Sequence, residues 1–198
     1  MKMTIGQQLR ACGRKKVPDH IAWKGVVYTR VCVFKHDFFA ATSLYRREKA
    51  GEETGEKDQI VLKLGRCADF LGVPLTWLGE MLARHESGIL SYIGGEQAVP
   101  QLLGRYGRTG LIYRYIEGQS LAENPPLPED FFEELSKLLA RIHRYRVAYV
   151  DMNKKGNILL GADGKPKMID FQISCRIPRR ILGSAEWADG ILDILQKE

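Results

Sequence analysis

Two aspartates and one asparagine near the C-terminal end of the chain have the types and the order that phosphate chemistry requires. Asp151 and Asn157 lie in the segment 149–160, and Asp170 follows a short apolar run. Mg²⁺ prefers oxygen ligands, so an asparagine carbonyl and an aspartate carboxylate can hold magnesium ions that bridge phosphates. A separate aspartate can orient and deprotonate an acceptor hydroxyl. The pattern therefore predicts Asn157 and Asp170 as magnesium ligands and Asp151 as the base of a phosphoryl-transfer site.

The segment between Asn157 and Asp170 predicts a β-hairpin that would bring these two residues to the same end. Residues 158–160 and 167–169 are short apolar runs, and Asp163 with Gly164 forms a strong turn signal between them. Aspartate and asparagine are also ordinary turn formers, so any one of these residues alone could simply shape a loop. The three residues in this order, with a hairpin between the last two, favour a phosphoryl-transfer site over a simple loop.

Such a site also needs a lysine on a strand that contacts the phosphates, and a helical carboxylate that holds the lysine. The apolar run 59–64 predicts a strand that contains Lys63. Residues 76–93 carry apolar residues at helical spacing and two acids, Glu80 and Glu86. We expect Glu86 to be the partner of Lys63, with Glu80 as the alternative. An exposed lysine and a solvated helix face are the commoner roles of such residues.

The middle of the chain predicts two further strands, at 99–103 and 111–116, followed by a hinge at 117–121. Residues 128–145 have apolar side chains at helical spacing and are interpreted as a core helix. Backbone groups just before the hinge could hydrogen-bond the edge of an adenine ring. They belong to Arg114, Tyr115 and Ile116.

The ordered set resembles the protein-kinase-like superfamily, closest to small bacterial kinases near the RIO-type atypical kinases and the lipopolysaccharide core sugar (Kdo/heptose) kinases. The resemblance covers residues 26–175. It implies a bilobal α+β fold: a basic N-terminal arm (1–25), an N-lobe of antiparallel sheet with one helix (26–117), and a minimal, mostly helical C-lobe (118–198). It also implies that ATP and Mg²⁺ bind between the lobes.

The resemblance assigns a role to each candidate residue. Lys63 would bind the phosphates and Glu86 would hold that lysine. Asp151 would be the catalytic base. The magnesium ligands would be Asn157 and Asp170.

Several departures from the family pattern bear on these assignments. No glycine lies in the segment 35–41 where a glycine-rich loop is expected, so Lys35 could substitute for backbone amide donors. Tyr149 and Val150 stand where typical kinases have His and Arg, which argues against regulation by an activation-loop phosphate. The Asp151-to-Asn157 spacing is one residue longer than in the kinase pattern, which leaves Asn153 as an alternative ligand.

The end of the chain departs from the pattern as well. Gln172 replaces the usual glycine after the magnesium aspartate, which argues against large flips of that segment. Only 28 residues (198 − 170) follow Asp170, too few for the helical platform of ordinary protein kinases. We expect a minimal carboxy lobe, or a chain that has been cut short.

Composition is that of a globular protein, with 44% hydrophobic and 27% charged residues. No apolar run is long enough to cross a bilayer, and no signal peptide is evident. Four cysteines and four histidines are scattered without paired spacing, so neither a zinc site nor a disulfide scaffold is expected. The prediction is a cytoplasmic protein. The net charge of +6 suits an acidic partner, such as an anionic surface at the inner membrane face, but nothing indicates a nucleic-acid-binding module.

The sequence thus predicts an ATP-dependent kinase that uses Mg²⁺ to transfer the γ-phosphate to a hydroxyl. The acceptor would be a protein Ser or Thr, or a lipid-linked saccharide of the lipopolysaccharide core. Phosphorylation of an aminoglycoside-like small molecule shares the chemistry but normally needs a larger helical pocket. The alternative class is a pseudokinase, a nucleotide-binding scaffold without transfer activity, which the missing glycine loop and the altered residues 149–150 would suit.

Overall fold

The structure is a computed structural model that describes residues 4–48 and 58–177, and its contacts divide the chain into two compact units. The first unit is Met1–Ser87 with Leu102–Tyr115, and the second is Gly88–Gln101 with Ile116–Glu198. Residues 88–101 therefore belong to the second unit, although they precede the hinge that the sequence indicated. The predicted α+β class is confirmed. No helix in the described part is both long and apolar enough to span a bilayer.

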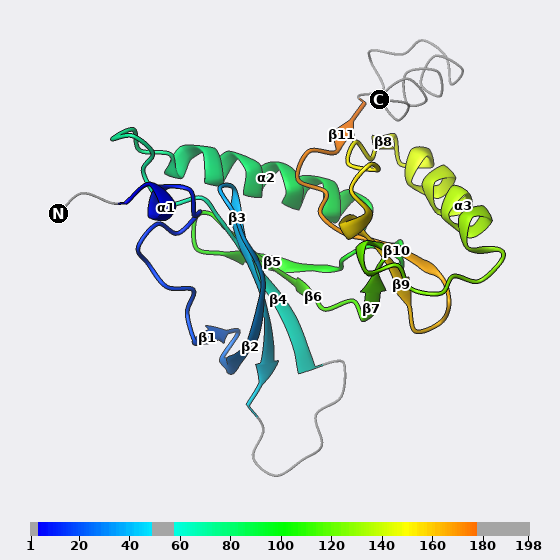
Figure 1. Ribbon diagram of the computed structural model, residues 1–198, viewed down its shortest axis with the longest axis horizontal. Helices are drawn as coiled ribbons and strands as arrows, with labels where there is room; N and C mark the ends of the chain where they lie inside the picture. The colour runs from blue at the N-terminus through cyan, green and yellow to red at the C-terminus, as the bar shows by residue number, and fades with distance from the viewer. Residues whose placement is uncertain (1–3, 49–57, 178–198) are drawn as a thin grey trace. The chain divides into compact units, whose positions relative to one another are not determined.

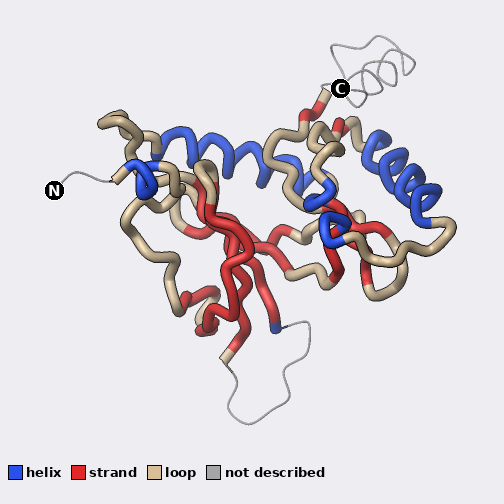
Figure 2. The backbone as a smooth tube through the Cα atoms, viewed as in Figure 1, coloured by secondary structure: helices blue, strands red, loops and turns tan. Residues whose placement is uncertain are grey.

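The first unit is built on an antiparallel six-stranded sheet in the order β1-β2-β3-β4-β6-β5 (Figure 1). Its strands appear in red as a curled sheet in Figure 2. The strands are β1 (His20–Trp23), β2 (Val26–His36), β3 (Ala40–Arg47), β4 (Gln59–Gly65), β5 (Leu102–Tyr106) and β6 (Gly110–Arg114). Its helices are α1 (Ile5–Gln8) and most of α2 (Thr76–Tyr92), and α2 matches the predicted helix to within one residue.

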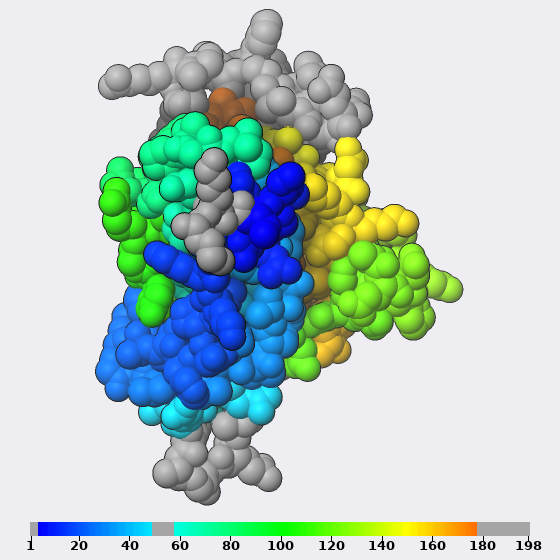
Figure 3. Space-filling view, turned by 60° about the vertical axis from the view of Figure 1, so that its left-hand side comes forward, coloured from blue at the N-terminus to red at the C-terminus, as the bar shows by residue number. Residues whose placement is uncertain are grey.

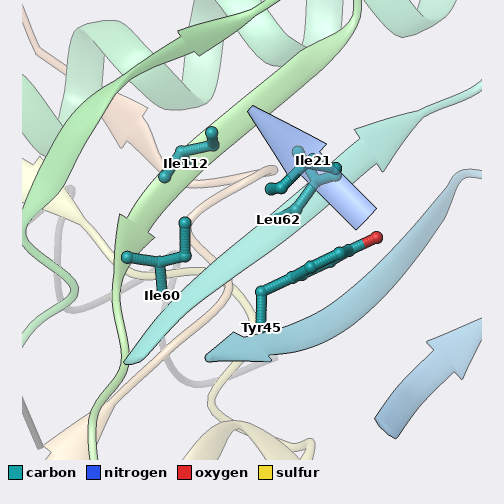
Figure 4. Close-up of a cluster of buried hydrophobic side chains, with 5 residues drawn as sticks. All are labelled: Ile21, Tyr45, Ile60, Leu62 and Ile112. Atoms are coloured by element: carbon teal, nitrogen blue, oxygen red, sulfur yellow. The ribbon is translucent and has the colours of Figure 1, made fainter. Parts of the chain in front are cut away.

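Strand β4 occupies an inner position of this sheet, between β3 and β6. Because side chains alternate along a strand, its residues serve two faces. Ile60 and Leu62 point into a cluster with Ile21, Tyr45 and Ile112, which come from β1, β3 and β6 (Figure 4). The intervening residues, including Lys63, belong to the opposite face. Lys63 thus lies on a strand that is hydrogen-bonded along both edges.

The described part of the predicted arm, residues 4–25, contributes a helix, a strand and buried side chains to this unit. Ala11, Cys12 and Ile21 are buried, and β1 pairs with β2. The guanidinium of Arg66, which follows β4, is fully buried and donates to the backbone carbonyls of Gln8 (2.8 Å) and Phe38 (2.9 Å). In Figure 3 the N-terminal segment, dark blue, lies on the surface of this unit beside strands in lighter blue.

The second unit contains one long described helix and two small sheets. Strands β7 (Gly118–Ser120), β9 (Ile158–Gly161) and β10 (Pro166–Met168) form a sheet in the order β10-β9-β7, and β8 (Val147–Ala148) pairs with β11 (Cys175–Arg176). The helical elements are α3 (Phe131–Arg144) and the 3-10 turns η2 (Leu121–Glu123) and η3 (Lys155–Asn157). The segment expected to be a hinge, 117–121, therefore contributes a strand to this sheet. The reason is a pairing of Gly118 with Gly161 across the sequence.

Helix α3 is amphipathic, as its periodicity predicted. Phe131, Leu135, Leu138 and Ile142 recur at helical spacing and are buried. The first turn carries acidic side chains and the last turn basic ones, which complements the helix dipole. Just beyond α3, β8 leads directly into the segment that carries Asp151.

Candidate active site

Lys63 and Glu86 form a buried ion pair within the first unit. The ammonium nitrogen of Lys63 lies 2.7 and 3.0 Å from the two carboxylate oxygens of Glu86. Lys63 faces Thr42 on β3 and Leu111 on β6, so the neighbouring strands fix its backbone on both sides. Glu86 lies in α2 and reaches the same face of β4. Glu80, the alternative partner, instead binds Arg84 (2.6 Å) and Arg108 (2.8 Å).

The burial of this pair bears on its role. The Lys63 and Glu86 side chains are 7% and 4% exposed. Removing two charges from water costs several kcal/mol per ion, which an ion pair recovers only with good geometry. An apolar pair would hold β4 and α2 together at least as well. The pair is therefore better suited to present an oriented ammonium group than to add stability.

The turn between β2 and β3 is closed by a carboxylate instead of by glycines. The carboxylate of Asp37 accepts hydrogen bonds from the backbone N–H groups of Phe39 (2.8 Å) and Ala40 (2.9 Å). Lys35 pairs with the same carboxylate at 2.7 Å. Burial acts to raise the pKa of Asp37, but the Lys35 and backbone hydrogen bonds outweigh it, so the net shift is downward. Lys35 thus binds an internal anion in this turn.

The backbone groups assigned to adenine lie at the end of β6. Arg114 pairs with Ile60 of β4, and the N–H of Tyr115 donates to the carbonyl of Gln59 at 3.3 Å. The ring of Tyr115 stacks on that of Phe34, with centroids 6.2 Å apart and planes 11° from parallel. Ile116 falls in the second unit. The backbone N–H of Tyr115 is therefore hydrogen-bonded to β4. The side chain of the same residue forms a stacked pair with Phe34.

In the second unit, Asp151 lies among polar partners at the start of the loop after β8. One of its carboxylate oxygens accepts from the ammonium of Lys154 at 2.7 Å and from the side-chain amide of Asn157 at 3.3 Å. The Asp151 side chain is 16% exposed, while that of Lys154 is 61% exposed. The carboxylate is thus held in place by two donors from its own loop.

The predicted hairpin is present and connects Asn157 to the Asp170 segment. Strands β9 and β10 pair with Met168 opposite Ile158, and the turn is closed by a hydrogen bond from Gly161 N–H to the Lys165 carbonyl. The next residue, Ile169, donates its backbone N–H to the Asn157 carbonyl at 2.9 Å. Asp170, bonded to Ile169, is therefore adjacent to the Asn157 backbone.

Asp170 itself adopts a left-handed backbone conformation, with φ of 61°. Asparagine and aspartate tolerate this region better than other non-glycine residues, but the conformation still costs energy. Tyr149 supports this segment: its hydroxyl donates to the Ile169 carbonyl at 2.5 Å, and its ring packs edge-on against Phe171, with centroids 4.9 Å apart. Both rings are fully buried. Packing thus imposes the backbone that carries Asp170.

The polar side chains of this loop fit a magnesium ion that also binds phosphates. The side-chain amide nitrogen of Asn157 donates to Asp151. The side-chain carbonyl oxygen of the same residue is a hard oxygen donor of the kind that Mg²⁺ prefers. No cluster of three or more His, Cys, Asp or Glu side chains that could hold a metal occurs in residues 4–48 and 58–177. Mg²⁺ does not need one, since it commonly binds one or two protein ligands, phosphates and water.

Three residues of these arrangements were not assigned a role from the sequence. Lys154 pairs with Asp151, Tyr149 holds the carbonyl before Asp170, and Asp37 closes the glycine-free turn. The lysine, three positions after the aspartate, could have been noticed as a neighbouring cation. The contacts of Tyr149 are long-range and leave no local pattern.

Comparison with known proteins bears on the fold. No protein-family model and no curated protein sequence matches the chain. Among solved structures it is similar to the Rio2 kinase from Chaetomium thermophilum, determined as an ADP/Mg²⁺-phosphoaspartate complex. The TM-score is 0.58 at 16% sequence identity, and the match covers 84% of this chain. It covers 53% of the Rio2 chain, so this protein spans about half the length of that kinase. The chain has an α+β, protein-kinase-like fold.

Proposed function

We propose that this protein is an ATP-dependent phosphotransferase that transfers the γ-phosphate to a hydroxyl group. Lys63 would contact the nucleotide phosphates and Glu86 would hold it. Asn157 and Asp170 would bind Mg²⁺, which neutralises charge on the phosphate oxygens when it is bound. Asp151 would orient the acceptor hydroxyl and accept its proton.

The observation that carries this proposal is the buried Lys63–Glu86 ion pair, formed in a kinase-like fold. A strand lysine held by a helical carboxylate is the arrangement that kinases use to contact phosphates. Its burial supports a functional role, because burying two charges costs free energy that an apolar pair would not cost. Glu86 pairs with Lys63, whereas Glu80 binds two arginines. This supports Glu86 as the carboxylate that would hold the phosphate-binding lysine.

The Asp151 loop gives a second line of support. The carboxylate of Asp151 is held by Lys154 and Asn157, and such fixed geometry is what a general base needs. The exposed ammonium of Lys154 would also offer a positive charge to a transferring phosphoryl group. Removing it would therefore affect turnover more than nucleotide affinity.

The test is ADP release from MgATP by the purified chain, with cell extract as the source of acceptor. We expect Asp151→Asn to lower the rate by about 10²- to 10⁴-fold while nucleotide affinity stays nearly unchanged. Asp163→Asn is the matched control, because Asp163 also pairs with a nearby lysine, Lys167, but lies on the hairpin turn. Full activity in Asp151→Asn would refute the proposed base.

The acceptor can be identified with γ-labelled ATP. Label in protein indicates a Ser or Thr acceptor, and label in lipid-linked saccharide indicates a lipopolysaccharide core sugar. The Rio2 structure contains a phosphoaspartate. If this chain forms one, label would appear on the chain itself and be released by hydroxylamine. The peptide that carries the label would identify the phosphorylated residue. A cytoplasmic location at an anionic membrane surface stays a prediction from the sequence.

One observation favours the alternative of a nucleotide-binding scaffold. The Asp37 carboxylate takes the two backbone amides of its turn and the Lys35 ammonium, which are donors that could otherwise position the γ-phosphate for transfer while a nucleotide is still bound elsewhere in the site. Nucleotide-dependent stabilisation without turnover in any extract would support this alternative. If Asp37→Ala then showed turnover, the Asp37 carboxylate would be the reason that the wild type transfers no phosphate.

A further inference from the structure

Two cysteines that are far apart in the sequence lie together in the first unit. Cys12 follows α1 and Cys67 follows β4, 55 positions later (67 − 12). Cys67 packs against the buried cluster that contains Cys12. Both are free in the structure, with Cys12 buried and Cys67 partly exposed. The other two cysteines, Cys32 and Cys175, are exposed.

The backbone on both sides holds the two thiols in place. The carbonyl of Ala11 accepts from the N–H groups of Cys67 (2.9 Å) and Ala68 (3.0 Å). The N–H of Cys12 donates to the His36 ring nitrogen at 3.4 Å. Beside them, the buried Arg66 guanidinium donates to the Gln8 carbonyl at 2.8 Å. These backbone hydrogen bonds keep the segments that carry Cys12 and Cys67 next to each other.

The surroundings make the two thiols unequal. Interaction with the Cys12 thiol lowers the pKa of Cys67 to about 6, and the positive charges of Lys15 and Arg66 act in the same direction against burial. Interaction with Cys67 and burial raise the pKa of Cys12. A partly exposed thiolate beside a protonated, buried thiol is the arrangement of an attacking and a resolving cysteine.

We propose that Cys67 and Cys12 form a dithiol site that hydrogen peroxide oxidises to a reversible disulfide. The Cys67 thiolate attacks one peroxide oxygen, so that an S–O bond forms, the O–O bond breaks and hydroxide leaves. The Cys12 sulfur then attacks Cys67, the S–S bond forms, and the sulfenic oxygen leaves as water with the Cys12 proton. Both sulfurs are oxidised and both peroxide oxygens are reduced. The reaction is independent of the proposed phosphotransferase activity.

The experiment uses the full chain, reduced, freed of reductant and treated with hydrogen peroxide. The decisive variant is Cys32→Ser/Cys175→Ser, which removes the two exposed thiols and leaves the Cys12 and Cys67 environment intact. We expect it to lose both remaining thiols and two hydrogen atoms in mass, and to yield a peptide that links Cys12 to Cys67. A dithiol reductant should restore both thiols. In Cys12→Ser, Cys67 should instead accumulate as a sulfenic acid that dimedone traps.

The result does not depend on the folding of a Cys12 variant, because the decisive variant retains both thiols. Persistence of the two thiols in that variant, under peroxide that fully oxidises Cys32 in the wild type, would overturn the proposal. Oxidation of Cys67 alone to higher acids, with Cys12 still reduced, would also overturn it.

Discussion

The Lys63 ammonium lies 2.7 Å from a Glu86 carboxylate oxygen, and both side chains are almost completely buried. The pair connects an inner strand of the sheet to helix α2. Breaking a buried pair leaves a charge without its partner in a medium that solvates it poorly. The two residues should therefore be strongly coupled in stability as well as in any role toward nucleotide.

We expect Lys63→Met and Glu86→Gln each to lower the free energy of unfolding by about 3–5 kcal/mol, as for other broken buried pairs. Urea unfolding measures the effect. The double variant Lys63→Met/Glu86→Leu should regain much of the stability, because both charges are gone, but should have no turnover. A comparable loss in Glu80→Gln, whose carboxylate binds only exposed arginines, would contradict the special role of the buried pair.

The assignment of Asn157 as a metal ligand predicts a difference between two asparagines of one loop. Asn157→Ala should raise the Mg²⁺ concentration needed to stabilise the ADP-bound chain by about tenfold or more. Loss of a residue that only hydrogen-bonds to a metal ligand already lowers metal affinity by about that factor. Asn153→Ala, at an exposed position of the same loop, should not. Melting temperature in the presence of ADP, titrated with Mg²⁺, is the measurement. The reverse order would move the metal ligand to Asn153.

Two glycines of α2 should respond in opposite ways to alanine. A Cβ at Gly79 would meet the Arg66 carbonyl oxygen at 2.0 Å, whereas a Cβ at Gly88 would have nothing within 4 Å. Gly79→Ala should therefore destabilise the protein and displace α2 from β4. Gly88→Ala should stabilise it by about 0.5–1 kcal/mol, because alanine is the better helix former. Thermal unfolding compares the two, and equal effects would mean that α2 does not approach Arg66.

Glu96 should make the stability of the protein depend on acidity. Burial acts to raise its pKa, but hydrogen bonds from Arg141 (2.8 Å) and from the Ala98 N–H (3.2 Å) outweigh it, so the pKa is lowered. A lowered folded-state pKa stabilises the native state above the unfolded value of 4.5, and this contribution is lost as pH falls through the folded pKa. We expect Glu96→Gln to cost about 1 kcal/mol at pH 7, since Arg141 is partly exposed.

The gap between the Glu96→Gln variant and the wild type should close as the pH falls below 4.5. Urea unfolding across this range measures it. Glu133→Gln, which removes an exposed partner of Lys137, is the matched control and should show little change at any pH. A gap that stays constant with pH would mean that the Glu96 carboxylate is not the group involved.

Local patterns in the sequence were enough to predict several elements that carry the candidate site. The 158–168 hairpin follows from two apolar runs around an Asp-Gly turn, and α2 and α3 follow from helical periodicity. The strand that contains Lys63 follows from its apolar neighbours. Each of these signals depends on residues that are close in the chain, so each can be read without the fold.

Other features depend on contacts between distant segments, and only the tertiary structure decided them. Residues 118–120 form a strand because β9 pairs with them, and residues 20–23 join the large sheet because β2 pairs with them. Glu86 rather than Glu80 reaches Lys63 because of how α2 lies against β4. Cys12 meets Cys67 for the same kind of reason. The sequence by itself determined which residues could do chemistry, whereas long-range packing decided which of them meet, because side-chain partners are chosen by three-dimensional distance and not by spacing along the chain.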